Sequence, residues 1–507
     1  MAVTFVQKPI GLINNTFSLP VITNWNPMIG YMVLSDDDNS NFFYQKLILR
    51  VKLDDVNGEV IAMMKQRGNG YGPDITANRI RAFFDLREIA NAQTTDTYFD
   101  QNCDGAPFQS IHGVGSSSGV NDSGDSLTDF IFSLNGNRQT GGSQVVKLHV
   151  EATQEYSLSV SQAPGSSYIG APEDTQTYIQ ATLPLEQARF VITGGFDTEY
   201  IQGNAFLPYT LNNTSSQFLS NKPVETFKLG GATRTGVRNI VHFDTSTNLG
   251  DYHTLAFLNG AEFSSQAQSI KIRYYESDGT IIGDYAFNND ATTGGQTPSL
   301  ITSNTQKLLY FGCGPGNLEA QTVNTAARPS NNANWDYYGV RAHSTSTGAG
   351  GLFKSATYYF EKSKTCTKYK RRRLGFLNNL GGYDYMNFEL KNVRTVEIKR
   401  ETYDKMLGFF NGSRYRYDNT ARGVTTRKVT AKMTETLQTD YISEEMVPFI
   451  ETLLLSKRVD LVKIEDDEFY VPVVIKDSSF VRKTTANDNL IQYTIKIEYA
   501  NYINTNT

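Results

Sequence analysis

The sequence of 507 residues predicts a mostly β protein, in which tandem β-sandwich-like domains are followed by a smaller α+β C-terminal domain. Three observations favour this fold class: the composition, the alternation of apolar and polar residues, and dipeptides typical of tight hairpin turns. Tyr and Phe contribute 29 residues each and bring the aromatic fraction to 12%. Aromatic residues suit strands, and the plentiful Gly and Asn residues suit the turns between strands.

Apolar residues alternate with polar ones in four segments of the chain, at 46–53, 146–151, 270–274 and 491–499. A period of two places one set of side chains on a core face and the other on a solvent face of a strand. Asn57-Gly58 follows the first segment, and Asp278-Gly279 follows the third. Because both dipeptides tolerate positive φ, each predicts a hairpin with the strand after it.

Helical signals are few. The clearest predicted helix spans 443–456, where Ser443 can cap the first turn and apolar residues recur once per turn. A shorter candidate spans 79–92. Two stretches rich in Gly, Ser and Asn, 113–142 and 288–298, predict long loops, the first with a short strand around Ile131.

These segments divide the chain into three predicted domains. A β-sandwich-like domain with a long Gly/Ser-rich loop spans 1–200, a second β domain spans 201–390, and an α+β docking domain spans 391–507. The net charge of −5 is spread over both signs, whereas a nucleic-acid-binding domain would be basic. No apolar run approaches the roughly 18 residues of a membrane helix, and the first residues do not resemble a secretory signal.

The cysteines and histidines are sparse. Cys103, Cys313 and Cys366 form an odd set, which argues against a disulfide framework and predicts three thiols made in a reducing cytoplasm. Five histidines provide little material for metal or acid–base sites. We therefore expect no catalytic residues, no resident metal and no cofactor.

Two loop motifs carry weak chemical signals. Ser117 lies at the centre of a Gly-x-Ser-x-Gly pattern near His112, but a nucleophile elbow needs a strand before it and a helix after it. The Ser/Gly-rich context favours a chance match. Residues 100–105, from Asp100 to Gly105, match the first half of a calcium loop, yet its twelfth position is Ile111 instead of Glu. An Asp/Asn-rich turn is the favoured interpretation, and calcium binding stays an open alternative.

Two further stretches have a structural and a functional interpretation. The dense basic stretch 362–373 includes Tyr369 and could contact nucleic acid, but a solvated or subunit-facing strand is favoured. Trp335 and Tyr337 follow an Asn-rich turn, and an exposed ring there could stack on a sugar. The alternative, which we favour, is a core tryptophan at the start of a strand.

One stretch is more specific than these. Residues 366–388 combine a Cys, a nearby Tyr, a Phe-Leu-Asn, a Gly-Gly and an aromatic–acidic pair, which are Cys366, Tyr369, Phe376-Leu377-Asn378, Gly381-Gly382 and Tyr383-Asp384. The stretch resembles a segment common in large β-rich virion proteins of tailed phages that infect Bacteroidetes. Segments at 26–27, 43–44, 84–86, 436–441, 455–459, 470–475 and 490–499 are similar to the same group, so the resemblance covers about half of the chain. The Gly-Gly permits a tight turn that Asn378 and Asp384 can bond locally, which predicts a fold determinant.

The resemblance implies a structural role in the tail or tail tip of a virion assembled in the bacterial host cytoplasm. Together with the missing catalytic motifs, it predicts a tail or baseplate subunit that forms a ring with its own copies and with other virion proteins. A receptor-binding protein that recognises a host-surface glycan for attachment is the main alternative, and a polysaccharide depolymerase is the third. Membrane insertion is not expected, and nucleic acid is an unlikely partner.

Overall fold

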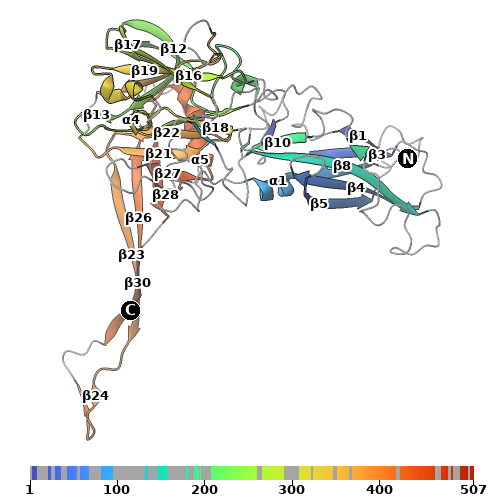
Figure 1. Cartoon of the computed structure of the whole chain (residues 1–507). Coiled ribbons are helices and arrows are strands. Elements are labelled where there is room, and N and C mark those ends of the chain that lie inside the picture. Colours follow the sequence, from blue (N-terminus) through green and yellow to red (C-terminus); the bar gives the residue numbers. More distant parts are fainter. Residues whose placement is uncertain are drawn as a thin grey trace. The chain divides into compact units, whose positions relative to one another are not determined.

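The structure is a computed structural model of the chain. It describes residues 3–7, 21–23, 29–35, 43–53, 58–67, 81–94, 132–134, 145–157, 179–180, 188–192, 194–195, 207–259, 265–289, 308–320, 324–345, 351–364, 368–417, 423–462, 470–477, 481–482, 491–500 and 503–506. The predicted mostly β character is confirmed, because most of the elements in these ranges are strands gathered into sheets (Figure 1).

The chain forms two compact units. The first holds residues 1–363 and 378–384, and the second holds 364–377 and 385–507. The domain boundaries predicted from the sequence lie at 200 and 390 instead. One cause is visible in β7 (Phe132–Leu134), which comes from the first predicted domain but pairs with β18 (Leu308–Gly312) of the second. Strand pairing between residues so far apart cannot be inferred from composition.

The N-terminal part of the first unit contains a six-stranded sheet. Its strands are β2 (Val21–Thr23), β10 (Ala188–Ile192), β8 (Val145–Ser157), β4 (Phe43–Leu53) and β5 (Val60–Arg67) in that order, with β9 (Ile179–Gln180) on β8. The antiparallel pairing of β4 with β5 confirms that these strands form a hairpin, while Asn57 of the predicted turn lies outside the described residues. Apolar residues of β4 and β8, such as Leu49 and Val150, are buried in one cluster.

A smaller sheet and one helix share that cluster. The sheet consists of β1 (Val3–Gln7), β3 (Ile29–Ser35) and β6 (Arg81–Asp85), and β6 leads to α1 (Arg87–Gln93). The helix predicted over 79–92 is therefore half strand. Ala82 and Phe84 are buried while Phe83 between them is exposed, which is the period of a strand and not of a helix.

The second part of the first unit is built on another six-stranded sheet. Its order is β11 (Glu225–Leu229), β12 (Ala232–Val241), β20 (Tyr358–Lys362), β19 (Tyr337–His343), β16 (Ser269–Tyr275) and β17 (Ile281–Asn288). A three-stranded sheet contains β15 (Thr254–Leu258), β18 and β7, and β13 (Phe243–Asp244) pairs with β14 (Leu249–Gly250). Short helices η3 (Leu207–Tyr209), α4 (Pro315–Ala320), η8 (Thr325–Ala327) and η9 (Pro329–Asn331) connect these strands.

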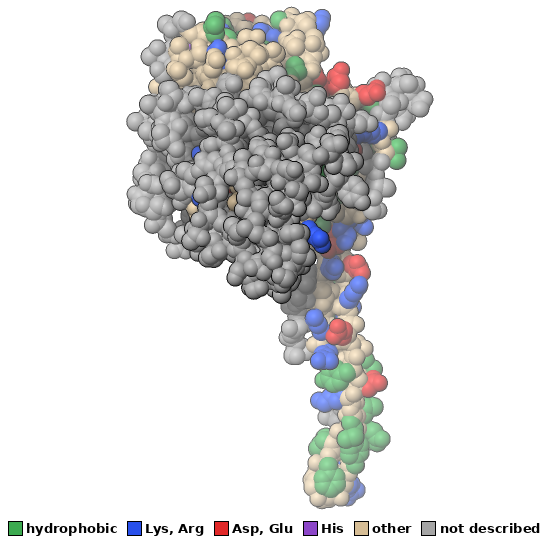
Figure 2. Space-filling view, turned by 90° about the vertical axis from the view of Figure 1, so that its right-hand side faces the viewer, with side chains coloured by type: hydrophobic (Ala, Val, Ile, Leu, Met, Phe, Trp, Pro, Cys, Tyr) green, Lys and Arg blue, Asp and Glu red, His purple; other side chains and the backbone are tan. Residues whose placement is uncertain are grey.

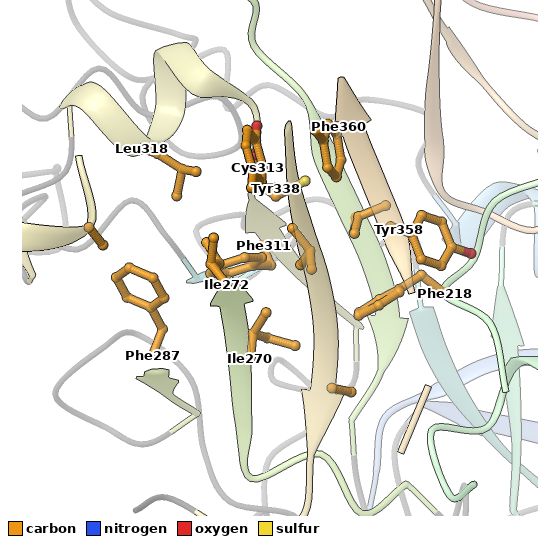
Figure 3. Packing of buried hydrophobic residues seen from close by; sticks show 14 of the residues in the cluster. Phe218, Ile270, Ile272, Phe287, Phe311, Cys313, Leu318, Tyr338, Tyr358 and Phe360 are labelled. Atoms are coloured by element: carbon orange, nitrogen blue, oxygen red, sulfur yellow. The ribbon is translucent and has the colours of Figure 1, made fainter. Parts of the chain in front are cut away.

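Aromatic and aliphatic side chains of these strands form one continuous core (Figure 3). The rings of Tyr338 and Phe360 stack with their centroids 5.0 Å apart. The buried Tyr338 hydroxyl donates to the carbonyl oxygen of Cys313 at 2.7 Å, so its polar end is satisfied. The predicted hairpin at Asp278-Gly279 is confirmed by the antiparallel pairing of β16 with β17, and Gly279 has a φ of 93°.

The second unit is organised by an eight-stranded sheet. Its order is β22 (Tyr383–Phe388), β21 (Arg372–Leu377), β27 (Val459–Val462), β28 (Tyr470–Ile475), β29 (Thr494–Tyr499), β26 (Val424–Gln438) and β23 (Val393–Asp404), with β30 (Ile503–Asn506) also on β26. The helix predicted over 443–456 is present as η10 (Glu444–Met446) and α5 (Val447–Leu455). Phe449 of α5 packs on Phe376 of β21, with ring centroids 5.4 Å apart, so the helix covers the core side of the sheet.

A candidate interaction arm

The strands β23 and β26 form a two-stranded ribbon that extends beyond the other strands of the second unit (Figure 1). β26 has 15 residues, but β29 pairs only with its last five, from Thr434 to Gln438. β30 accompanies it only from Lys428 to Ala431. At about 3.3 Å per residue, β26 spans roughly 50 Å. We call the hairpin from Val393 to Gln438 the arm.

One face of the arm is apolar in its middle, between the Arg394–Glu435 pair and Arg400. Directly paired residues of an antiparallel ladder point to the same side, so the pairs Val396–Met433 and Ile398–Ala431 share a face. Leu437 lies on that side as well and is buried in the core of the unit. The core side of β26 therefore continues along the arm, where Val396 and Ile398 are 49% and 51% exposed. We call Val396, Ile398, Ala431 and Met433 the stripe.

The opposite face of the arm is polar. It carries Thr395, Glu397, Lys399 and Glu401 of β23, which pair with Thr and Lys residues of β26. Glu397 and Lys399 form an exposed ion pair at 3.5 Å. This face suits contact with water, so the two faces of the ribbon differ in the environment they require.

A buried carboxylate anchors the arm where the ribbon joins its sheet. Glu435 is 1% exposed and accepts a hydrogen bond of 2.7 Å from Nε of Arg372 on β21. The Tyr499 hydroxyl donates to the other carboxylate oxygen at 2.8 Å. Arg394 of β23 lies 3.6 Å from the same oxygen and donates to the Tyr499 hydroxyl at 3.0 Å. Burial, followed by the hydrogen bond with Glu435, raises the pKa of Tyr499.

The arm ends in a tight turn between β24 (Phe409–Phe410) and β25 (Tyr415–Arg416). The Asn411 side-chain oxygen accepts from the backbone N–H groups of Ser413 and Arg414, and Gly412 has a φ of 92°. Asn411-Gly412 is the hairpin dipeptide that the sequence analysis used elsewhere but overlooked here. With the alternation on both sides, it was the signal from which the arm could have been found.

Large apolar side chains gather at this turn (Figure 2). About half of the exposed large hydrophobic residues in the described part of the chain lie between Val393 and Val424. We call residues 405–417 the arm tip. Its exposed apolar residues are Met406, Leu407, Phe409, Phe410, Tyr415 and Tyr417, with exposed fractions from 41% to 76%. Lys405, Arg414 and Arg416 lie among them, and the nearest acidic residues, Asp404 and Asp418, border the tip in the sequence.

The basic stretch is divided between two environments. Lys368 and Lys370 are exposed, in keeping with the predicted solvated surface. Arg372 and Arg373 of β21 are buried, which corrects that prediction for this end of the stretch. Arg372 bonds Glu435, and Arg373 donates to the side-chain oxygen of Asn387 at 2.7 Å. Both guanidinium groups therefore form hydrogen bonds inside the second unit.

The Gly-Gly turn behaves as the sequence predicted. Asn378 is fully buried; its side-chain oxygen accepts from the backbone N–H groups of Leu380 and Gly382, and its amide donates to Asp384 at 2.8 Å. Gly381 has a φ of 83°, a conformation that favours glycine. The sequence did not indicate the fourth partner of this side chain, the carbonyl oxygen of Leu219, to which the same amide donates at 2.9 Å.

The residues proposed for glycan contact are interior. Trp335 is 4% exposed and Tyr337 is fully buried. The Trp335 ring lies in the aromatic core with Phe243 and Tyr338, at centroid distances of 5.8 and 5.4 Å. Sugar stacking needs an accessible ring face, so neither Trp335 nor Tyr337 can stack on a glycan in this structure.

Other candidates of the sequence analysis lie outside the described residues. These are the calcium-loop match at 100–105, the Ser/Gly motif with His112, Cys103 and Cys366. Cys313 is a buried thiol whose sulfur lies 3.5 Å from the carbonyl oxygen of His253. Within the part of the chain that the structure describes, no three His, Cys, Asp or Glu side chains cluster as metal ligands would. The helices described there include none that is long and apolar enough to span a membrane.

No protein-family model matches this chain, and no curated protein matches it. The arm is thus the feature on which a functional interpretation can be built.

Proposed function

We propose that this chain is a structural subunit of a tailed bacteriophage virion, in the tail or baseplate, and that its arm joins it to a neighbouring subunit. The observation that carries the proposal is the arm, whose exposed stripe and tip combine apolar and aromatic side chains with arginines. Tyr and Arg dominate the energetically important positions of protein interfaces. An apolar surface of this kind in a soluble protein marks an interaction site. The resemblance of residues 366–388 to phage virion proteins supports the choice of particle.

The same interpretation accounts for the shape of the ribbon. A hairpin of two strands is marginally stable by itself in water. Here its base is fixed by Glu435, while its distal half has no other described strand beside it. A neighbouring subunit would supply the missing cover. Because the Trp335 ring is buried, it does not support the receptor-binding alternative, and the long loops of that alternative lie largely outside the described residues.

The test begins with particles purified from the bacterium that produces this chain. We expect mass spectrometry to find the chain in banded tailed particles and immunogold electron microscopy to place it on the tail. A second strain carries a shortened arm, in which Asn-Gly replaces residues 402–427 and joins the paired residues Glu401 and Lys428. Its chain should fold but enter particles at a strongly reduced copy number.

The matched control is the double variant Glu397→Ser and Lys399→Ser, which alters the polar face and keeps the stripe and tip. It should enter particles at the normal copy number. Tailed particles that lack the wild-type chain would overturn the virion role, and normal incorporation of the shortened chain would overturn the role of the arm.

A further inference from the structure

The arm tip has a chemical complement in the same unit. Asp440, Glu444 and Glu445 lie within six residues just after β26, and all three are exposed. Tyr441 among them is 58% exposed. We call residues 440–445 the acidic segment. It contains three acidic and no basic residues, whereas the tip contains three basic and no acidic residues, and both expose aromatic side chains.

The two surfaces cannot meet within one chain. The acidic segment follows the base of the arm, and the tip lies at its far end. They are separated by the length of β26, which is roughly 50 Å of extended strand. The ladder between β23 and β26 continues in register from Val393 to Asp404 with one bulge after Glu401, so the arm does not fold back on itself.

We infer that the arm tip of one copy docks on the acidic segment of a second copy, and that this contact builds the assembly in the proposed function. The occupant is a second copy because its chain supplies the complementary charge and an exposed aromatic ring at one place. The contact joins two different surfaces, so in a pair one copy keeps an unused segment and the other keeps an unused tip. Such head-to-tail contacts close into a ring or continue as a filament.

The stripe of the arm fits the same arrangement. Docking at the tip would lay the apolar side of Val396 and Ile398 along the neighbouring copy, where it is removed from water. Opposite charges at the tip would select the register of the contact, and the apolar side chains would supply the burial.

Charge reversal tests the inference on the purified full-length chain. The tip variant carries Lys405→Glu, Arg414→Glu and Arg416→Glu, and the segment variant carries Asp440→Lys, Glu444→Lys and Glu445→Lys. Sedimentation and electron microscopy should show self-association of the wild type, and each variant alone should bind itself at least about tenfold more weakly. An equimolar mixture should associate again, because each tip then meets a segment of opposite charge. Recovery in the mixture also shows that both variants are folded.

The control variant carries Lys368→Glu, Lys370→Glu and Lys391→Glu, which change the net charge as much as the tip variant does. These lysines are exposed and lie outside the tip, so self-association should be unchanged. Self-association that tolerates both reversals, or none at all in the wild type, would overturn the inference. So would binding of the tip to phosphatidylglycerol vesicles in place of a second copy. If the chain is found in the virion but the purified chain shows no charge-dependent self-association, this contact is rejected and the proposed function still stands.

Discussion

Asn378 shows how one residue can hold a turn in place. Its side chain uses two donor and two acceptor positions, and all of them are engaged inside the protein. Burial raises the pKa of its neighbour Asp384, and hydrogen bonds from Ser220 and Asn378 oppose the rise. Gly382 completes the turn, because a Cβ atom there would lie 2.0 Å from the carbonyl oxygen of Leu219. The conformation of the loop is thus determined by buried hydrogen bonds of Asn378.

Replacing Asn378 with Ala should destabilise the first unit by roughly 3 kcal/mol, because several buried groups would lose their partner. Urea unfolding measures the loss, and hydrogen exchange of the amides at 378–384 should accelerate. Asn379→Ala is the matched control, since the Asn379 side-chain oxygen is buried without a hydrogen-bond partner. A similar loss in both variants would argue against the network.

At the scale of elements, the arm depends on the base from which it extends. Arg372, Arg394 and Tyr499 come from three different strands and converge on Glu435. A two-stranded ribbon gains little from its own ladder, so a fixed base is what gives the distal residues a defined direction. The anchor therefore links the core of the second unit to the surface that we propose for assembly.

Glu435→Ala should destabilise the second unit by roughly 3–5 kcal/mol, because Arg372 would remain buried without its carboxylate. Hydrogen exchange should increase at residues 393–396 and 433–438, at the base of the arm. Glu397→Ala removes an exposed partner of Lys399 and should change neither measurement. Unchanged exchange at the base of the Glu435 variant would show that the carboxylate does not anchor the arm.

Periodicity predicted the strands but not the contacts between residues that are far apart in the sequence. The alternation at 46–53 and 270–274 located β4 and β16, and the apolar pattern at 443–456 located α5, because these signals are local. The basic stretch gave no hint that Arg372 would be buried, since its partner Glu435 lies 63 residues away. The arm was overlooked because the sequence of its strands is typical of half-buried strands, and only the tertiary structure shows that Val396 and Ile398 of β23 are exposed.

For the whole molecule, the division into units is less simple than the predicted one. A boundary at 390 would make 391–507 a removable docking domain. In the structure, β21 and part of β22 belong to the second unit although they precede that boundary. Leu374, Phe376 and Phe388 lie in the same core as Ile450 and Ile495, so a cut at 390 divides one core.

A chain ending at Glu389 should consequently aggregate, because the cut divides this core. Its residual strands would expose apolar surface that the full chain buries. Size-exclusion chromatography and binding of a hydrophobic dye measure the outcome. The same truncation with Phe376→Ser and Phe388→Ser should be more soluble. A truncated chain that elutes as a clean monomer would contradict the shared core.

The loop of Asn378 has a further consequence for the order in which this protein is made. A ribosome extends a chain at roughly 5–20 residues per second, from the N-terminus onward. The first unit needs residues 378–384, but residues 364–377, which belong to the second unit, are synthesised before them. Leu219 and Ser220 therefore cannot form their hydrogen bonds with Asn378 and Asp384 until residues 364–377 of the second unit have been synthesised. Translation thus couples the completion of one unit in time to the beginning of the other.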